Sequence, residues 1–411
     1  MLKQSWLRVT HCEVCGSELP NPTLNLGLQP LCDDLAPIGW KGSVDKFPIE
    51  ISLCPCCLTA HQLVAVRKER LFPRCYHYRA RFTADVLNGM HDLAAECELV
   101  SGGVVGKLVC DVGCNDGSLL SIFHNRGART VGIEPTAAAV DATAAGHRVL
   151  NGYFTEEIAE ELLRICGRPN IITFTNVFAH IESLQQAIDA LKLLVDERTV
   201  IVIENHYLGA VLDGRQFDTF YHEHPRTYSA RSFAFIAARL GGQITKVSYP
   251  GRYGGNIRVY IGRCNSHRPN RPEEMGTAED GFAVKLARLQ DFIAGWKEDS
   301  RQQIAHLSAN ASLYGKSFPG RASILINLLE LDSNIHELIF EKPGSMKIGH
   351  YVPGTTIAIR SDVEWLEKRV CPDAMVIWGW HIAEEIAGYV KAGGYRGKLY
   401  SPLPRFRQID A

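Results

Sequence analysis

The segment 107–134 contains glycines and carboxylates that are spaced as in a nucleotide-binding fold. They are Gly113, Gly117, Asp111, Asp116 and Glu134. The segment 107–120 reads Lys-Leu-Val-Cys-Asp-Val-Gly-Cys-Asn-Asp-Gly-Ser-Leu-Leu, and a second apolar run at 130–133 ends in Glu134. Glycines let the backbone approach a ligand closely, and a carboxylate after the second run can accept hydrogen bonds from both ribose hydroxyls. The pattern therefore predicts a ligand that contains a ribose.

The carboxylates indicate which nucleotide binds. A dinucleotide fold brings a pyrophosphate onto the helix N-terminus, where Asp111 and Asp116 of this chain would repel it. A ribose joined to a cationic amino-acid end suits these groups better, so the loop favours S-adenosylmethionine (SAM) over NAD. An ordinary strand–helix turn with incidental glycines is the alternative. The predicted SAM-binding residues are Asp111, Gly113, Asn115, Asp116, Gly117, Glu134 and Asn176.

Two Cys-x-x-Cys pairs predict a metal site. Cys12 and Cys15 form the first pair, and Cys54 and Cys57 form the second, which begins 39 positions after Cys15. Four thiolates satisfy the tetrahedral coordination that zinc prefers, and a full set of four leaves no open position, so we expect a structural zinc ion. Unpaired cysteines in a reduced protein are the alternative, and Cys32 is an alternative ligand with a poorer spacing.

The segment 220–225, Phe-Tyr-His-Glu-His-Pro, brings together a phenol, a carboxylate and two imidazoles in Tyr221, Glu223, His222 and His224. It follows the predicted fourth core strand, at the sheet edge where α/β proteins bind ligands. Histidine and glutamate are the usual general bases, and a carboxylate beside an imidazole raises its basicity. The alternatives are an exposed polar loop and a His-x-His metal site, whereas a zinc protease is excluded because His-Glu-x-x-His is absent.

Two further candidates have less support from their surroundings. Asn176 and His180 follow the predicted strand 171–174 at the same sheet edge, so His180 either points into the site or begins a helix. Tyr76, within Cys-Tyr-His-Tyr-Arg at 75–79, reads by itself as a packing aromatic.

Alternating strand and helix patterns must position these groups. The alternation indicates a doubly wound α/β sheet, and a closing antiparallel hairpin is expected after its fourth strand. The predicted strands span 108–112, 130–133, 171–174, 200–203, 243–249 and 257–262. The predicted helical segments span 75–105, 155–166 and 183–194, and a further helix begins at Ser118.

The C-terminal part predicts a second α/β unit. A Pro-rich linker at 267–272 precedes a long amphipathic helix from about 279 to 309. Strand and helix patterns then alternate again over 323–330, 356–359, 374–380 and 382–391. The predicted domains are a zinc-binding domain at 1–74, a SAM-dependent methyltransferase domain at 75–264 and a Rossmann-like α/β domain at 265–411.

Composition limits the classes of partner. The 411 residues carry a formal net charge of −1 with both signs interspersed, so no basic face for nucleic acid is expected. No stretch reaches the roughly 18 uncharged apolar residues of a membrane helix. Thirteen cysteines, several of them within predicted elements, fit a reducing compartment. We therefore expect a cytoplasmic monomer without nucleic-acid or membrane partners.

The motifs, taken together and in this order, resemble the SAM-dependent sugar 3-C-methyltransferases of deoxysugar biosynthesis, which act on nucleotide-linked 4-keto sugars. The resemblance covers nearly the whole chain, although the segments 79–83, 204–207 and 314–321 depart from the family pattern and leave the exact sugar open. It implies three domains, of which the C-terminal one helps to enclose a nucleotide-sugar substrate, most often dTDP-linked. It also implies roles in the sugar pocket for Tyr76, His180, Tyr221, Glu223 and His224.

The resemblance leads to a mechanistic hypothesis. A ketone at C4 acidifies the C3 hydrogen, a base removes it, and the enolate carbon takes the methyl group of SAM. We predict His224 as the base with Glu223 orienting it, while Tyr221, His180 and Tyr76 bind the sugar and stabilise the enolate oxygen. Glu223 is the alternative base. The rival functions are an O- or N-methyltransferase of another small molecule and a zinc-ribbon methyltransferase that binds nucleic acid.

Overall fold

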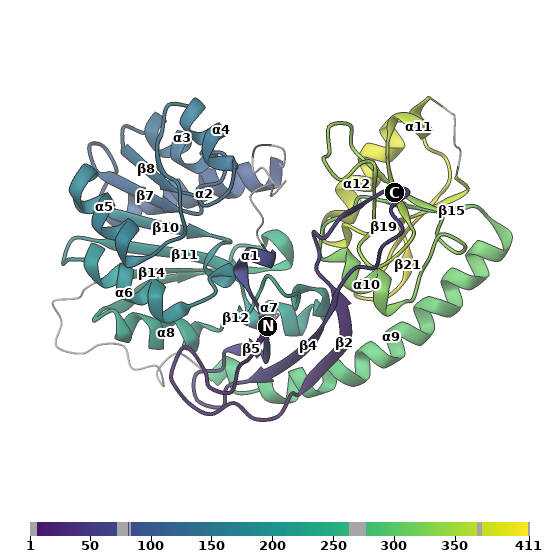
Figure 1. Cartoon of the computed structure of the whole chain (residues 1–411), viewed down its shortest axis with the longest axis horizontal. Coiled ribbons are helices and arrows are strands. Elements are labelled where there is room, and N and C mark those ends of the chain that lie inside the picture. The colour runs from purple at the N-terminus through teal and green to yellow at the C-terminus, as the bar shows by residue number, and fades with distance from the viewer. Residues whose placement is uncertain (1–5, 72–80, 82–83, 263–276, 368–371, 410–411) are drawn as a thin grey trace.

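The chain folds into two α/β lobes that are bridged by one long helix, α9 (Phe282–Asn310) (Figure 1). The computed structural model describes residues 6–71, 81, 84–262, 277–367 and 372–409. Tyr76 and the linker at 267–272 lie outside these residues. None of the described helices combines the length and the apolar composition that a membrane span requires.

The larger lobe is built on a seven-stranded sheet with the order β13-β14-β11-β10-β7-β8-β9. Its strands are β7 (Leu108–Val112), β8 (Arg129–Ile133), β9 (Arg148–Leu150), β10 (Ile171–Thr175), β11 (Val200–His206), β13 (Gln243–Ser248) and β14 (Asn256–Gly262). Five strands run parallel, and β14 pairs antiparallel with both β11 and β13, which confirms the predicted doubly wound sheet and its closing hairpin. Apolar runs such as Val-Ile-Val-Ile in β11 suit a strand that helices cover on both faces.

Among the described residues of this lobe, the helices that begin at residues 84, 118, 156 and 184 fall in the predicted helical segments, and three further helices were not predicted. In chain order, the helices are α2 (Ala84–Ser101), α3 (Ser118–Asn125), α4 (Ala138–Ala144), α5 (Glu156–Cys166), α6 (Leu184–Leu194), α7 (Leu208–Asp213) and α8 (Ala230–Arg239). The start of α8 is fixed by a capping box, in which the Ser229 and Ser232 side chains each accept from the other residue's backbone amide. This cap sets where the first helix after the segment 220–225 begins.

A buried ion network supports the carboxyl end of β11. The Glu204 carboxylate is fully buried and lies 2.7 Å from Arg258 Nε and 2.9 Å from Arg252 Nε. Arg258 Nη1 also lies 2.6 Å from Glu96 Oε2 on α2, so the network joins the sheet to a covering helix. Because each buried charge has an opposite partner, the network fixes the backbone immediately before His206.

The smaller lobe contains an eight-stranded sheet with the order β21-β20-β19-β15-β16-β18-β17-β3. Its strands are β15 (Leu313–Lys316), β16 (Leu338–Glu341), β17 (His350–Tyr351), β18 (Ala358–Ser361), β19 (Ala374–Ile377), β20 (Lys398–Ser401), β21 (Arg407–Gln408) and β3 (Ala36–Pro37), and its helices are α10 (Ala322–Leu328), α11 (Val363–Leu366) and α12 (Ala383–Ala392). The α/β class is as predicted, and β15, β16 and β20 are additions to it.

The N-terminal segment contains more sheet than its turn-rich composition suggests. It supplies β1 (Trp6–Arg8), β2 (Leu24–Pro30), β4 (Lys46–Leu53), β5 (Ala60–Gln62), β6 (Val64–Val66) and the short helix α1 (Lys68–Leu71). Its sheet is completed by β12 (Arg226–Thr227), whereas β3 joins the smaller lobe through β17. Strand pairing thus joins residues that were assigned to different predicted domains, and the boundaries at 74 and 264 remain a prediction.

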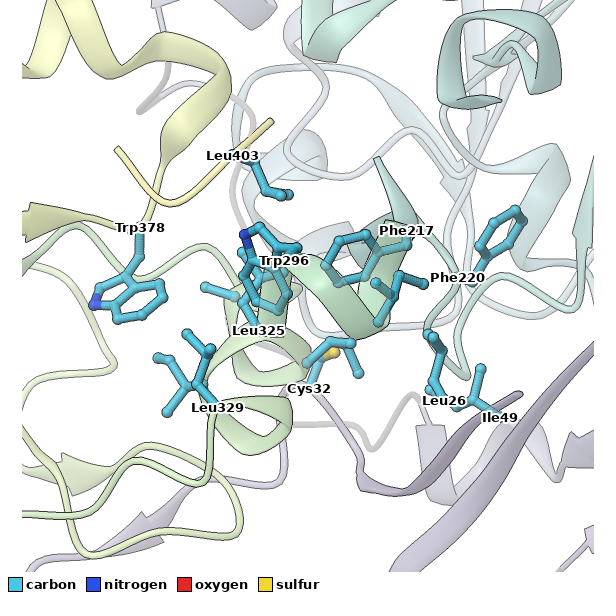
Figure 2. Packing of buried hydrophobic residues seen from close by; sticks show 14 of the residues in the cluster. Leu26, Cys32, Ile49, Phe217, Phe220, Trp296, Leu325, Leu329, Trp378 and Leu403 are labelled. Atoms are coloured by element: carbon cyan, nitrogen blue, oxygen red, sulfur yellow. The ribbon is translucent and has the colours of Figure 1, made fainter. Parts of the chain in front are cut away.

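One apolar core joins the three parts of the chain. Figure 2 shows members of this core from the N-terminal sheet (Leu26 and Ile49), from α9 (Trp296) and from α10 (Leu325), with Phe217 next to Trp296. The rings of Phe217 and Trp296 meet edge to face with centroids 4.9 Å apart, and Trp296 Nε1 donates to the backbone oxygen of Pro402 at 2.8 Å. This shared core holds the two lobes against the N-terminal strands.

Candidate active site

The loop after β7 has a backbone that only glycine allows at two positions. Gly113 has φ +71°, and a Cβ atom there would lie 2.2 Å from Cγ2 of Val177. Gly117 has φ +79° and directly precedes α3. Because both residues have left-handed backbone angles and no side chain, the turn can pass close to a ligand at the end of β7.

Glu134, at the end of β8, is buried and held in place by three donors. Its Oε1 atom accepts from the backbone amide of Thr136 at 2.8 Å and from the Thr136 hydroxyl at 2.6 Å. Its Oε2 atom accepts from the backbone amide of Asn115 at 3.0 Å. A carboxylate offers about four acceptor positions, so Glu134 retains capacity for a ribose hydroxyl.

Asp111 suits a cationic ligand. It is buried at the end of β7, and burial raises its pKa to about 7, although the Thr173 hydroxyl lowers it through a 2.6 Å hydrogen bond and the Glu134 charge raises it again. A positive charge nearby favours the ionised carboxylate. The amino group of SAM is such a charge, so the residues at this edge fit the predicted cofactor.

Asp116 and Asn176 are both engaged with the protein itself. Asp116 Oδ1 accepts from the Ser118 hydroxyl at 2.6 Å, and Oδ2 accepts from the backbone amide of Arg81 at 2.9 Å. Asn176 has φ +53°, and its Oδ1 atom accepts from Asn256 Nδ2 at 3.2 Å. The structure therefore places both at the expected sheet edge, with contacts that hold the loops around it.

Replacement of Glu134 by Gln is expected to weaken SAM binding. The substitution keeps the shape but removes the charge that strengthens a hydrogen bond to a ribose hydroxyl, which corresponds to roughly 10- to 100-fold in Kd. Calorimetric titration with SAM measures this change. Glu156→Gln, at an exposed position on α5, is the matched control, and equal affinities for the two variants would remove Glu134 from the cofactor site.

Three histidines from separate segments meet at the carboxyl ends of β10 and β11. His180 ends a short 3-10 helix (Phe178–His180), His206 ends β11, and His224 comes from the predicted reactive segment. The ring centroids of His180 and His224 are 4.6 Å apart, and those of His206 and His224 are 5.4 Å apart. Burial lowers the pKa of His180 to about 4 and the pKa values of His206 and His224 well below their usual range. All three imidazoles are therefore neutral at neutral pH, and each has one ring nitrogen without a proton.

His224 is held in one tautomer. Its Nδ1 atom lies 3.1 Å from the backbone oxygen of Thr219, which can only accept, so Nδ1 carries the proton. Its Nε2 atom lies 3.0 Å from the Tyr221 hydroxyl and accepts from it. Tyr221 and His224 thus form a hydrogen-bonded pair in which a proton taken up at the phenolic oxygen can pass to the imidazole.

The predicted contact between Glu223 and His224 is wrong. Both ring nitrogens of His224 have other partners, the Thr219 carbonyl and the Tyr221 hydroxyl, and the buried Oε2 atom of Glu223 has no hydrogen-bond partner among the described residues. Glu223 contributes its backbone oxygen instead, which accepts from His180 Nδ1 at 2.7 Å. Adjacent residues in a tight turn point in different directions, and for this reason sequence neighbours did not become partners in space.

The buried Glu223 carboxyl should make the stability of the folded protein depend on pH. Burial raises its pKa to about 8, with a further contribution from Asp33. Because the folded-state pKa exceeds the unfolded one, this residue stabilises the fold below about pH 4.5, and the stabilisation is lost as pH rises toward 8, by about 1.4 kcal/mol per unit of pKa shift at most. Urea unfolding at several pH values should show a decline across this window in the wild type and a smaller one in Glu223→Gln. An equal decline in both proteins would contradict the assignment.

Several residues of this region were not predicted from the sequence. His206 follows the same strand-end rule as His180 and could have been found by it. Arg321 and His381 come from the smaller lobe, where Arg321 Nη2 donates to His381 Nδ1 at 3.2 Å. The ring of Tyr253 lies between the two lobes, with centroids 5.9 Å from His206 and 6.3 Å from His381. The resemblance implied that the C-terminal domain helps to enclose the substrate, but no sequence pattern indicated which of its residues reach this sheet edge.

The four predicted metal ligands form one cluster. The sulfur atoms of Cys12 and Cys57 are 3.4 Å apart, as are those of Cys15 and Cys54, and all four lie within 4.8 Å of one another. Zn–S bonds of about 2.3 Å in a tetrahedron place sulfur atoms about 3.8 Å apart, so the cluster fits zinc. A zinc ion held by these four thiolates would leave no position for substrate.

The other proposed metal ligands lie elsewhere. Cys32 Sγ accepts from the Ser323 hydroxyl at 3.3 Å, far from the cluster in the fold. His222 Nε2 donates to the backbone oxygen of Phe47 at 3.2 Å, which turns its ring toward β4 and away from His224. Within the described residues, no second group of three close potential ligands occurs.

Two arginines anchor the Cys12–Cys15 turn, called the zinc knuckle below, to the larger lobe. The fully buried Arg226 side chain forms an ion pair with Glu13, between the first two cysteines, and donates to the backbone oxygen of Glu182 at 3.3 Å. Arg239 Nη1 donates to the backbone oxygen of Glu13 at 2.6 Å. Since residue 182 follows His180 closely, the knuckle supports the backbone next to the histidine cluster.

The chain matches three family models in order along its length. They are described as a zinc binding domain at residues 12–72, a methyltransferase domain at 78–247 and a C-methyltransferase C-terminal domain at 252–404. Among curated proteins, it is 26% identical to C-methyltransferase NovU of Streptomyces niveus, over 98% of this chain and 97% of that protein.

Solved structures resemble a part of the chain only. Magnesium protoporphyrin IX methyltransferase (ChlM) of Synechocystis PCC 6803 with bound SAH is 16% identical, with a TM-score of 0.35 over 44% of this chain and 84% of that one. A SAM-dependent methyltransferase of Clostridium acetobutylicum ATCC 824 is 13% identical, with a TM-score of 0.35 over 43% and 92%. Together, the three family models and the nearly full-length relative show that the chain is a SAM-dependent methyltransferase with a zinc-binding domain, a methyltransferase domain and a C-methyltransferase C-terminal domain.

Proposed function

We propose that this enzyme methylates C3 of a nucleotide-linked 4-keto-6-deoxysugar, with dTDP as the expected carrier, through an enolate. The observation that carries the proposal is the Tyr221–His224 pair, which lies among neutral, buried histidines at the sheet edge that also holds the cofactor loop. Carbon methylation beside a ketone needs such a proton acceptor, because the C–H bond must be broken before the carbon can attack.

The sequence of events follows from the chemistry of the ketone. Removal of the C3 proton leaves a pair of electrons that delocalises onto the C4 oxygen. SAM would supply an electrophilic methyl group: the C3 carbon forms a bond to it while the methyl–sulfur bond breaks, and the sulfur keeps that electron pair as a neutral thioether. The protein must therefore accept one proton and stabilise negative charge on one oxygen atom.

The proton acceptor in this proposal is His224. Its Nε2 atom carries no proton in the observed tautomer, and it reaches substrate either directly or through the Tyr221 hydroxyl. His180 lies against the His224 ring, with its Nδ1 proton committed to the Glu223 backbone oxygen, and would contact the sugar. Tyr76 keeps its role as an expectation from the family resemblance. Glu223 acts through its backbone oxygen rather than as a second base.

The cofactor and metal assignments complete the proposal. Glu134 and Asp111 would hold the ribose and the cationic end of SAM, with Gly113 and Gly117 permitting the close approach of the loop and Asn115, Asp116 and Asn176 shaping it. Cys12, Cys15, Cys54 and Cys57 would hold a structural zinc ion away from the reacting atoms.

The decisive experiment combines product mass with isotope exchange. The enzyme is incubated with SAM and a panel of dTDP- and GDP-linked 4-keto-6-deoxysugars, and a gain of one CH2 unit is sought by mass spectrometry. In deuterated buffer, with SAH (the form of SAM that has lost its methyl group) in place of SAM, the C3 hydrogen should exchange with solvent. A methyl group on oxygen or nitrogen, without C3 exchange, would instead establish the rival O- or N-methyltransferase.

A further inference from the structure

The short 3-10 helix η3 (Phe217–Thr219) lies between the two lobes and immediately before the reactive segment. Its residues are fully buried. Phe217 belongs to the shared core, in contact with Trp296 of α9, as Figure 2 shows. The two residues that follow it, Asp218 and Thr219, carry polar side chains that need partners in this buried position.

The smaller lobe supplies those partners. Arg321, which precedes α10, places Nε 3.2 Å from Asp218 Oδ2 and donates from Nη1 to the Thr219 hydroxyl at 3.3 Å. Trp380, the first residue of the short 3-10 helix η7 (Trp380–Ile382), donates from Nε1 to the same Asp218 oxygen at 2.8 Å. The guanidinium group also stacks on the Trp380 ring, 5.0 Å from its centroid.

These contacts lead to the proton acceptor through one atom. The backbone oxygen of Thr219 is the group that accepts from His224 Nδ1 and thereby sets its tautomer. The side chain of the same residue is held by Arg321. A shift of η3 would therefore move the carbonyl that orients His224, although the ring nitrogens of His224 bond to Thr219 and Tyr221 and not to Arg321 or Trp380.

We propose that Arg321 and Trp380 of the smaller lobe are positioning residues, which orient His224 through Asp218 and Thr219 of η3. This inference rests on the proposed role of His224. It gives the smaller lobe a part in the chemical step, because the geometry of the proton acceptor in the larger lobe depends on it. A misplacement of about 1 Å at such a group can cost on the order of 10²-fold in rate.

The C-terminal lobe contains a matched control for this proposal. Trp365 is also buried, and its Nε1 atom donates to a buried aspartate, Asp362, at 3.1 Å. Trp365→Phe therefore removes the same kind of hydrogen bond as Trp380→Phe, from the same lobe, without touching η3. Arg321→Lys keeps a positive charge but removes the fork that reaches Asp218 and Thr219 together.

The experiment measures turnover per SAM-binding site, with the concentration of sites taken from calorimetry. We expect Trp380→Phe to lower kcat about tenfold and Arg321→Lys about 10- to 100-fold, while KM for SAM stays unchanged and Trp365→Phe keeps the wild-type kcat. A merely structural role would reduce the number of binding sites without lowering the kcat of each site. Equal kcat per site in the three variants would overturn the proposal.

Hydrogen exchange provides a readout that needs no substrate. The backbone amides of Phe220 and His224 donate to the oxygens of Phe217 and Tyr221 at 3.2 and 2.8 Å. They should exchange faster in Trp380→Phe and Arg321→Lys than in the wild type or in Trp365→Phe. Unchanged exchange would refute the positioning role. If the wild type methylated none of the sugars, the proposed function would fail, while this measurement would still decide whether η3 depends on Arg321 and Trp380.

Discussion

Replacement of His224 by Asn is expected to lower kcat by about 10²- to 10⁴-fold and to leave SAM binding intact, because a positioned base contributes an effect of that size. Asn retains a side chain of similar polarity but cannot take up a proton. Its amide can still reach the Thr219 oxygen, so the loop should keep its conformation. Steady-state kinetics with the methylated sugar as product, together with calorimetric titration of SAM, measures both effects.

The control for this variant is His124→Asn, at an exposed position on α3. C3 deuterium exchange should be lost in His224→Asn to the same degree as methyl transfer, since both reactions share proton removal. If His224→Asn kept wild-type turnover, His224 would not be the base. If exchange persisted while methyl transfer failed, His224 would act after proton removal.

Replacement of Cys54 by Ser should abolish zinc binding and destabilise the whole enzyme. Removing one of four thiolates opens the site, and a ligand at a thousandfold excess over its Kd stabilises a fold by about 4.1 kcal/mol. The loss should extend beyond the knuckle, because Glu13 between the first two cysteines is the ion-pair partner of the buried Arg226. Metal analysis and thermal unfolding measure the two effects.

Cys56→Ser is the matched control. Cys56 lies between two members of the cluster in sequence but is exposed and outside it. We expect one zinc per chain and an unchanged unfolding temperature in this variant. A Cys54→Ser protein that retained full zinc content would exclude the four-cysteine site, and a loss of activity on chelation without any loss of stability would indicate a metal ion in the reaction itself.

Most of the larger lobe could be predicted from its sequence, because local patterns decide it. Apolar runs such as 108–112 and 171–174 have the composition of strands buried on both faces, and their observed bounds differ by at most one residue. Thr155 caps α5 and Ser183 caps α6, as the residue types suggest. In the smaller lobe, β15 contains Gly315 and Lys316 within its four residues, so it lacks the continuous apolar run that marked the strands of the larger lobe.

The candidate site could be predicted in its membership better than in its contacts. Glu134 and His180 were predicted because they follow the ends of strands, and the four clustered thiols were predicted from the Cys-x-x-Cys spacing. The partner of His224 could not be predicted, because a turn decides whether Glu223 or the Thr219 oxygen faces the ring. Arg321 and Trp380 reach η3 only through the packing of the two lobes, and a single sequence carries no signal for that packing.

The pairing of β3 with β17 has a consequence for how the polypeptide is made. Residues 36–37 leave the ribosome long before His350 and Tyr351, their partners in the sheet. The apolar faces of β2 and β4 likewise wait for α9 and α10, which cover them in the finished molecule. The nascent chain must therefore carry uncovered strands for most of its synthesis, and fragments truncated before the smaller lobe should aggregate or recruit chaperones.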